Sequence, residues 1–351
     1  MRIKTIVRLI ASCCALAAFA ACASFPDAPS PAAAPAHFEG EAFISYDGSA
    51  LGLTVWRAAE PKAVLVAVHG MNDYAHAFAG LGAWLSENEG VTVYAYDQRG
   101  FGRSPGFGRW HGEEAMILDL RAAVAAARAA HPGVPLFVLG HSMGAATVMT
   151  AMRDSDLGAD GVILAAPGVW GGSRLPIAYR IALNISANIL PGKTLTGERA
   201  GKQATDNIAI LREMFADPLV IKDTRLDAIL GVVRLMGDGW DASDEIGGRI
   251  LFLYGERDEI IPVKALKKTA ARLCGDVDVR AYPEGWHLLF RDLQAKTVWR
   301  DVGAWIRETE SQADAASPVS GSGPAASSCA GADGGRSVAV SATQRKDRVG
   351  V

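Results

Sequence analysis

Cysteine is scarce in this chain of 351 residues, and neither sign of charge dominates it. The five cysteines are too few and too scattered for a disulfide framework or a zinc site; they are Cys13, Cys14, Cys22, Cys274 and Cys329. Lys and Arg number 35 against 38 Asp and Glu, so the net charge of −3 gives no electrostatic reason to expect a nucleic-acid partner. Because 50% of the residues are hydrophobic and 21% are charged, we expect a sizeable buried core.

The hydrophobic run at the N-terminus, residues 9–21, is too short to cross a bilayer as a mature helix. It follows three cations and no acid, which is typical of a secretory signal peptide. The segment ends Phe19-Ala20-Ala21-Cys22 and resembles the lipobox of bacterial lipoproteins, although Phe19 stands where an aliphatic residue is usual. The resemblance implies cleavage before Cys22, lipidation of Cys22 and anchoring to a membrane. An alanine after the cysteine, here Ala23, resembles the pattern of lipoproteins that are sorted to an outer membrane. The alternative is cleavage after Ala20, which gives a soluble periplasmic or secreted protein.

Both ends of the chain differ in composition from its middle. Residues 22–37 are rich in Ala, Pro and Ser, which is typical of a flexible tether. Residues 311–351 contain no aromatic side chain, so we expect a disordered tail that cannot bury enough apolar surface to offset its ordering entropy. The predicted organisation is therefore a signal peptide (1–21), a tether (22–37), a folded domain (38–310) and a tail (311–351).

Within the folded domain, short apolar runs alternate with longer helical patterns. Asp47-Gly48 between two alternating runs predicts an opening β-hairpin. Further strands are expected at 63–68, 91–96, 136–139, 161–165, 250–254 and 277–281. Continuous apolar strands between helices predict an α/β fold with a mostly parallel sheet covered on both faces. Residues 169–247 show helical patterns without a clear strand, which predicts an inserted helical cap.

One turn carries a nucleophile motif. Residues 137–146 predict a strand, a tight turn and a helix, and the turn reads Gly140-His141-Ser142-Met143-Gly144. This G-x-S-x-G pattern is the nucleophile elbow, in which a strained backbone lifts the Ser142 hydroxyl above the sheet. Gly140 and Gly144 leave room for the strand and the helix to approach each other.

A serine hydroxyl needs a base, and the base in turn needs an acid to orient it. In this arrangement the partners follow in the order serine, acid, histidine. Of the seven histidines only His287 follows Ser142, so chain order alone selects it. Asp258 is the preferred acid because it follows the buried strand 250–254, at the sheet edge where sites form. Glu256 and Glu259 are the nearby substitutes.

The developing oxyanion needs fixed donors. One is the backbone N–H of Met143, and the other is expected from the loop after strand 63–68, where the N–H of Met71 is the candidate. We interpret His69 as a structural residue that braces this loop. No metal and no organic cofactor is required by this constellation.

These motifs together resemble the α/β-hydrolase fold, and more narrowly the monoacylglycerol lipase and lysophospholipase group, often labelled serine aminopeptidase-like. The resemblance covers about residues 38–308; it rests on His69-Gly70, residues 97–104, 140–144 and 255–262, and Gly285-Trp286-His287. It implies a cap over an acyl-binding tunnel and a structural role for residues 97–104. The family's His-Gly-x-Gly-Glu-His loop here reads His69-Gly70-Met71-Asn72-Asp73-Tyr74, a departure that bears on glyceryl-ester specificity.

The leading hypothesis is a serine hydrolase of carboxylic esters, such as monoacylglycerols or lysophospholipids, that acts through an acyl-enzyme. The alternatives are a short-chain carboxylesterase, an aminopeptidase-like amide hydrolase with an acidic anchor at Glu198, Asp206 or Glu213, and a tethered binding protein without activity. The apolar residues of the cap either form an acyl pocket or pack the cap against the core; they are Trp170, Tyr179, Leu183, Ile189, Leu190, Phe215, Leu219, Leu230, Leu235, Met236 and Trp240.

Overall fold

The computed structural model describes residues 25–196, 201–316 and 340–342. The predicted signal peptide, its cleavage site and Cys22 lie outside the described residues, as does most of the predicted tail. Among the described residues, no helix combines the length and the apolar character needed to cross a membrane.

A ten-stranded sheet forms the centre of the molecule, in the order β1-β2-β3-β5-β4-β6-β7-β10-β11-β12. The strands from β5 to β12 in this order pair in parallel, whereas β1, β2, β3 and β5 pair antiparallel. Their bounds are β1 (His37–Glu39), β2 (Ala42–Ile44), β3 (Ala50–Trp56), β4 (Ala63–Val68), β5 (Val91–Tyr96), β6 (Leu136–His141), β7 (Gly161–Ala165), β10 (Arg249–Gly255), β11 (Asp276–Tyr282) and β12 (Val340–Ala342). The predicted α/β class and the opening hairpin are both confirmed, the latter as β2 and β3 with Phe43 opposite Leu51.

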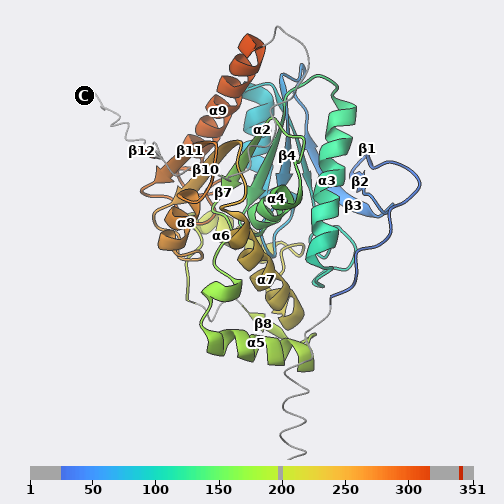
Figure 1. The fold of residues 1–351 in the computed structure, drawn as a ribbon, viewed down its shortest axis with the longest axis vertical. Helices are drawn as coiled ribbons and strands as arrows, with labels where there is room; N and C mark the ends of the chain where they lie inside the picture. The colour runs from blue at the N-terminus through green and yellow to red at the C-terminus, as the bar shows by residue number, and fades with distance from the viewer. Residues whose placement is uncertain (1–24, 197–200, 317–339, 343–351) are drawn as a thin grey trace, which may run out of the picture.

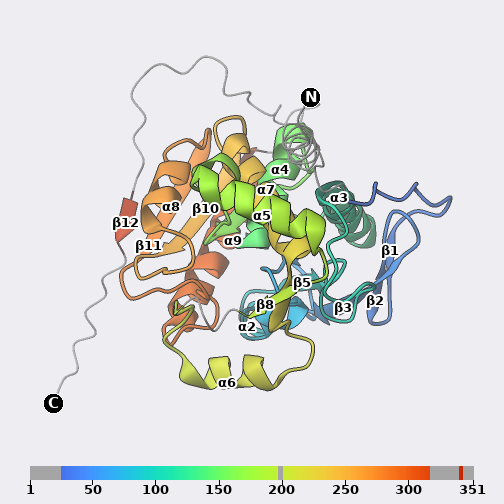
Figure 2. The ribbon, with the colours of Figure 1, turned by 90° about the horizontal axis from the view of Figure 1, so that it is seen from below.

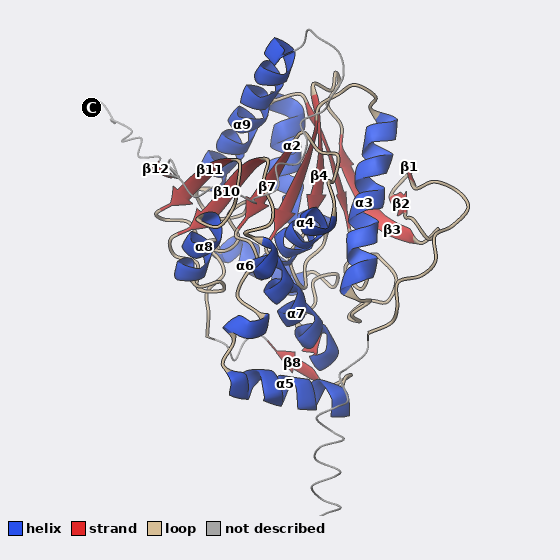
Figure 3. Ribbon diagram, in the orientation of Figure 1, coloured by secondary structure: helices blue, strands red, loops and turns tan. Residues whose placement is uncertain are grey.

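Helices cover both faces of the sheet (Figures 1 and 3). On β4, Val64, Val66 and Val68 point into one hydrophobic core, and the alternate residues point into a second core on the other face. The first core is closed by α3 (Glu113–Ala130), α4 (Met143–Asp154) and α8 (Val263–Ala270). The second is closed by the 3-10 turn η1 (Ala75–Phe78) with α2 (Ala79–Asn88) and by α9 (Ala295–Ala316). Every residue of β4 therefore meets one core or the other, which is why its sequence is apolar throughout.

The segment between β7 and β10 leaves the sheet and returns to the neighbouring strand. It contains η2 (Gly172–Arg174), α5 (Ile177–Ile189), β8 (Thr194–Thr196), α6 (Ile208–Ala216), β9 (Asp223–Arg225) and α7 (Leu226–Ala242). Figure 1 shows α5 at one end of the molecule, and Figure 2 shows α5 and α7 lying across that end. This segment, which includes the predicted cap, is called the insertion below. The short β8–β9 ribbon within it was not anticipated.

Contacts also involve the regions predicted as tether and tail. The Phe25 ring lies 6.3 Å from the Trp110 ring and packs near Leu183 and Ala187 of α5. The Ala32 N–H donates to the Tyr46 carbonyl at 2.7 Å. The predicted boundary at residue 310 falls inside α9.

Cys274 is disulfide-bonded, a role that the sequence did not assign to it, and the other cysteines lie outside the described residues.

Candidate active site

Ser142 lies in the turn between β6 and α4, and its backbone has φ 52° and ψ −114°. A positive φ is unusual for a residue with a side chain and is maintained only where the surroundings enforce it. The two motif glycines allow this turn. A Cβ atom on Gly140 would lie 2.5 Å from the Ala145 Cα, and one on Gly144 would lie 2.1 Å from the Val68 carbonyl oxygen. The strand and the helix therefore approach as closely as the sequence motif implies.

Three predicted residues form a continuous hydrogen-bonded chain. The His287 Nε2 lies 2.9 Å from the Ser142 Oγ, and the His287 Nδ1 lies 2.8 Å from the Asp258 Oδ2. Ser142 follows β6, Asp258 follows β10 and His287 follows β11, so the carboxyl ends of three strands bring them together. With Nδ1–H donating to the carboxylate, Nε2 is free to accept the serine proton.

Asp258, rather than its neighbour Glu256 or Glu259, contacts His287 in the structure. Glu256 pairs with Lys267 at 3.0 Å, and Glu259 accepts from the Gln203 N–H at 2.8 Å. The Asp258 Oδ1 accepts from the backbone N–H groups of Ile260 and Ile261, at 2.8 and 2.9 Å. Burial opposes the charged form of Asp258, but the attraction of His287 and these hydrogen bonds outweigh it and lower the pKa. The carboxyl group therefore stays ionised, as an orienting acid must.

His141 supports the loop that carries His287. Its Nε2–H donates to the His287 carbonyl oxygen at 3.0 Å, and its side chain is buried. Burial, with the proximity of His287, lowers the pKa of His141 from 6.5 to about 3, so the ring is neutral at physiological pH. The residue before Ser142 thus holds the backbone of His287.

The candidate oxyanion donors lie on two sides of Ser142. Met143 is the first residue of α4, where helix N–H groups lack intrahelical partners and favour negative charge. Met71 follows Gly70, and a Cβ on Gly70 would lie 3.3 Å from the Ser142 Cβ. His69 fixes this loop, because its Nδ1–H donates to the Gly70 carbonyl at 2.8 Å and its Nε2 accepts from the Gln98 N–H at 2.9 Å. These contacts agree with the structural role expected for His69, whose pKa burial lowers.

Residues 59–294 match the family model of the serine aminopeptidases S33, which is more than half of the chain. The chain belongs to the serine aminopeptidase S33 family. The resemblance to the serine aminopeptidase-like group is thereby confirmed.

This S33 chain is 29% identical to a monoacylglycerol lipase of Mycolicibacterium smegmatis over 279 residues, which cover 75% of this chain and 95% of the relative. It is 23% identical to the human monoglyceride lipase, over 78% of this chain and 92% of that one. Among solved structures, a Paleococcus ferrophilus monoacylglycerol lipase is similar with a TM-score of 0.64 and 21% identity, covering 74% of this chain and 99% of that one. A Saccharomyces cerevisiae monoglyceride lipase in complex with a substrate analog has a TM-score of 0.64 and 20% identity, covering 82% and 99%. These likenesses confirm the α/β-hydrolase fold.

Residues 97–104 of this S33 chain form a support beside the site. Asp97 accepts from the Ala75 N–H at 2.9 Å and from the Arg103 Nε at 2.8 Å. Arg99 is buried between Asp47 and Asp119, with both ion pairs at 2.7 Å. Asp97 and Arg103 thus pair within the loop and Arg99 ties it to Asp47 and Asp119, as the expected structural role requires.

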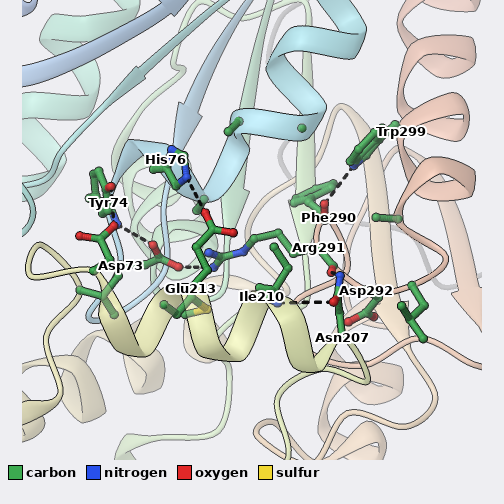
Figure 4. A pocket seen from close by; sticks show the side chains of 18 of the residues that line it. Asp73, Tyr74, His76, Asn207, Ile210, Glu213, Phe290, Arg291, Asp292 and Trp299 are labelled. Carbon is green, nitrogen blue, oxygen red and sulfur yellow. Dashed lines mark hydrogen bonds and ion pairs between the residues drawn. The ribbon is translucent and has the colours of Figure 1, made fainter.

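A cavity of about 430 Å³ lies at the seam between the insertion and the core (Figure 4). Its apolar wall includes Ile210, Phe290 and Trp299, and its polar rim includes the ion pairs Asp73–Arg291 and His76–Glu213. Ser142 and His287 do not line this cavity. The sequence analysis missed it, because residues from three separate segments form it, within 73–80, 207–220 and 290–299.

Of the eleven apolar residues that the sequence assigned to the cap, four are half-buried and the others are either buried or exposed. The first group, Leu235 and Trp240, is buried against the core; Leu230 is buried too, but it packs with Ala187 and Leu226 inside the insertion. A second group is exposed: Tyr179, Ile189, Leu190 and Phe215. The packing alternative therefore holds for the first group. Within the described residues, no cluster of three His, Cys, Asp or Glu is placed to hold a metal ion.

Proposed function

We propose that this serine ester hydrolase cleaves lipid esters, monoacylglycerols or lysophospholipids, through an acyl-enzyme at Ser142. The observation that carries the proposal is the chain of hydrogen bonds from Asp258 through His287 to Ser142, at 2.8 and 2.9 Å. A nucleophile, a base and an orienting acid in this order are the requirements for acyl transfer by serine.

In the proposed reaction, the Ser142 Oγ attacks the ester carbonyl while the His287 Nε2 takes its proton. The oxyanion accepts hydrogen bonds from the N–H groups of Met71 and Met143. The imidazolium, stabilised by ionised Asp258, then gives its proton to the leaving alcohol, and the acyl-enzyme remains. Water loses a proton to His287 as it attacks the acyl-enzyme, and the carboxylic acid leaves as Ser142 regains its proton.

Two lines of support favour an ester over an N-terminal amino acid amide. The relatives named above are monoacylglycerol or monoglyceride lipases, and the alignment covers 95% of the M. smegmatis protein. An aminopeptidase would need a carboxylate for the substrate's ammonium group. Of the candidates, Glu198 lies outside the described residues, Asp206 accepts from the Leu293 N–H at 2.9 Å, and Glu213 pairs with His76 at 3.1 Å.

We also propose that the protein is exported and anchored by lipid at Cys22. The N-terminal pattern supports export, and the disulfide at Cys274 supports it independently, because structural disulfides persist in oxidising compartments. Metabolic labelling with a palmitate analogue should mark the wild type and not Cys22→Ser. Equal labelling of both would contradict anchoring at this residue.

A fluorophosphonate probe tests the nucleophile directly. The probe should form an adduct on Ser142 of the folded wild type and none on Ser142→Ala. An unlabelled but folded wild type would refute the hydrolase and favour a binding protein.

A substrate series then tests the class of ester. It would compare short and long p-nitrophenyl esters, a monoacylglycerol, a lysophospholipid and an aminoacyl amide. We expect the highest kcat/KM for a long-chain lipid ester. A preference for short esters would make the protein a general carboxylesterase, and a preference for the amide would favour the aminopeptidase alternative.

A further inference from the structure

Residues 202–207 of the insertion contact both loops that carry the partners of Ser142. This segment, called the clasp below, lies between β8 and α6. On one side it holds the Asp258 loop, because the Gln203 N–H donates to the Glu259 Oε2 at 2.8 Å. The Lys202 Nζ also donates to the Glu259 carbonyl oxygen. Glu259 is the residue directly after Asp258, so the clasp reaches the acid through its neighbour.

On its other side the clasp holds the His287 loop at three backbone positions. The Leu288 N–H, directly after His287, donates to the Ala204 carbonyl at 2.9 Å. The Asn207 Nδ2 donates to the Arg291 carbonyl at 3.0 Å, and the Leu293 N–H donates to the Asp206 Oδ1 at 2.9 Å. The clasp therefore connects the loop after β10 to the loop after β11.

Asp292 completes this connection from the core side. Its side chain is 3% exposed, and its Oδ2 accepts from the Trp286 N–H, directly before His287, at 2.7 Å. The fully buried Thr205 of the clasp acts on the same carboxyl group and favours its charged form, and the Asp292 Oδ1 is buried without a hydrogen-bond partner among the described residues. Burial raises the pKa of Asp292 to about 6, while Thr205 and the Trp286 N–H favour the charged form. Figure 4 shows Asn207 and Asp292 at the same end of the seam cavity.

We propose that the clasp and Asp292 position His287 against Asp258 and Ser142, so that the placement of the insertion controls the rate of the chemical step. This inference rests on the proposed function of the triad. Asn207 and Asp292 are positioning residues, since they act on the backbone around His287 and not on the substrate. Small displacements of a catalytic base are costly, because a misplacement of about 1 Å lowers rates by about 100-fold.

Asn207 allows a matched test, because its side chain has two functions. Its Oδ1 caps α6 by accepting from the Ile210 N–H at 3.4 Å, while its Nδ2 holds the Arg291 carbonyl. Asn207→Asp keeps an N-cap acceptor but has no donor for Arg291. We expect this variant to react with a fluorophosphonate, and to turn over p-nitrophenyl butyrate, about tenfold more slowly, with KM changed less than about twofold. A wild-type labelling rate in Asn207→Asp would overturn the proposal.

Asp292 provides a second test with rescue by a conservative variant. Asp292→Ala removes the acceptor of the Trp286 N–H, and Asp292→Asn keeps an oxygen there. We expect kcat to fall by about 10 to 100-fold in the alanine variant and to stay within about threefold of wild type in the asparagine variant. Melting temperatures of both variants identify any loss that comes from unfolding. Equal losses in two folded variants would contradict positioning by this hydrogen bond.

Glu213→Ala is the control, because it breaks the His76–Glu213 contact between insertion and core without touching the clasp. Its labelling rate should stay within about twofold of the wild type. A loss as large as that of Asn207→Asp would show that any contact between insertion and core affects the rate, and it would contradict positioning of His287 by the clasp. If folded wild-type protein is not labelled, the proposed function fails; if it is labelled and the clasp variants match it, only this inference fails.

Discussion

The sheet and the insertion differ in how strongly packing constrains each residue. In β4, β5, β6 and β7 every residue is buried. In α5 the only buried residue is Ala187, and Ile177, Tyr179 and Ile189 are 64, 72 and 66% exposed. Removing a methylene therefore leaves a cavity in the sheet layer but not on the outer surface of α5. Ser142, Asp258 and His287 follow strands of the constrained region. The insertion contacts them at Gly168, whose N–H donates to the Ser142 carbonyl at 2.9 Å, and through the clasp.

The largest expected effect comes from removing the orienting charge at the sheet edge. Asp258→Asn keeps the size of the side chain but allows the wrong histidine tautomer, so we expect kcat to fall by about 10⁴-fold. Steady-state hydrolysis of p-nitrophenyl butyrate measures this loss. Glu256→Gln is the control, because Glu256 pairs with Lys267 and not with His287. This variant should retain nearly full activity. Similar losses in both variants would show that the acid has been assigned to the wrong residue.

A core substitution should be the next most severe change. Leu164 of β7 is fully buried, so Leu164→Ala should lower the free energy of unfolding by about 2–5 kcal/mol. Urea unfolding followed by circular dichroism measures it. A change below about 1 kcal/mol would mean that the core around β7 is less tightly packed than the structure shows.

Acid should destabilise the elbow through His141. Its pKa is lowered from 6.5 to about 3 in the folded protein, so below pH 6.5 the unfolded chain takes up a proton that the folded chain does not. This contribution to stability is complete above pH 6.5, and it is lost at about 1.4 kcal/mol per pH unit as the pH falls towards 3. The free energy of unfolding, measured between pH 7 and 5, should depend less steeply on pH in His141→Gln than in the wild type. Identical slopes would contradict a neutral buried His141, provided that the variant folds.

The smallest effect is expected on the exposed face of the insertion. Ile177→Ser should change the free energy of unfolding by no more than about 0.5 kcal/mol, because Ile177 is 64% exposed. The same urea experiment compares it with Leu164→Ala. A loss of more than about 1.5 kcal/mol would show that α5 is packed against something that the described residues do not include.

The fold was predictable where a residue's environment follows from its neighbours in sequence. The runs 63–68, 91–96 and 161–165 were predicted with the bounds of β4, β5 and β7, because unbroken apolar runs indicate burial on both faces. Chain order and strand ends identified Asp258 and His287 as well, since parallel strands bring their carboxyl ends to one edge. The hydrogen bonds of the triad agree with that choice.

The remainder depends on contacts between segments far apart in sequence. Nothing local indicates that Phe25, in an Ala- and Pro-rich segment, packs near Trp110 and α5. Thr205 and Asp292 are likewise ordinary polar residues in sequence, and only their burial together gives them a role. Exposed apolar residues such as Tyr179 and Phe215 gave the same helical pattern as buried ones, so periodicity did not separate them.

The insertion leaves the sheet at β7 and re-enters at β10, and these strands are direct neighbours, with Val162 opposite Ile250. In terms of protein engineering it is a cassette, because an insertion of different length or composition can be exchanged here without altering any strand pairing. Under the proposed function, such an exchange would vary the residues over the site on an unchanged sheet. The exception is the clasp: a chimera that replaces residues 202–207 would also exchange the proposed support of His287, and grafts should therefore be joined on either side of it.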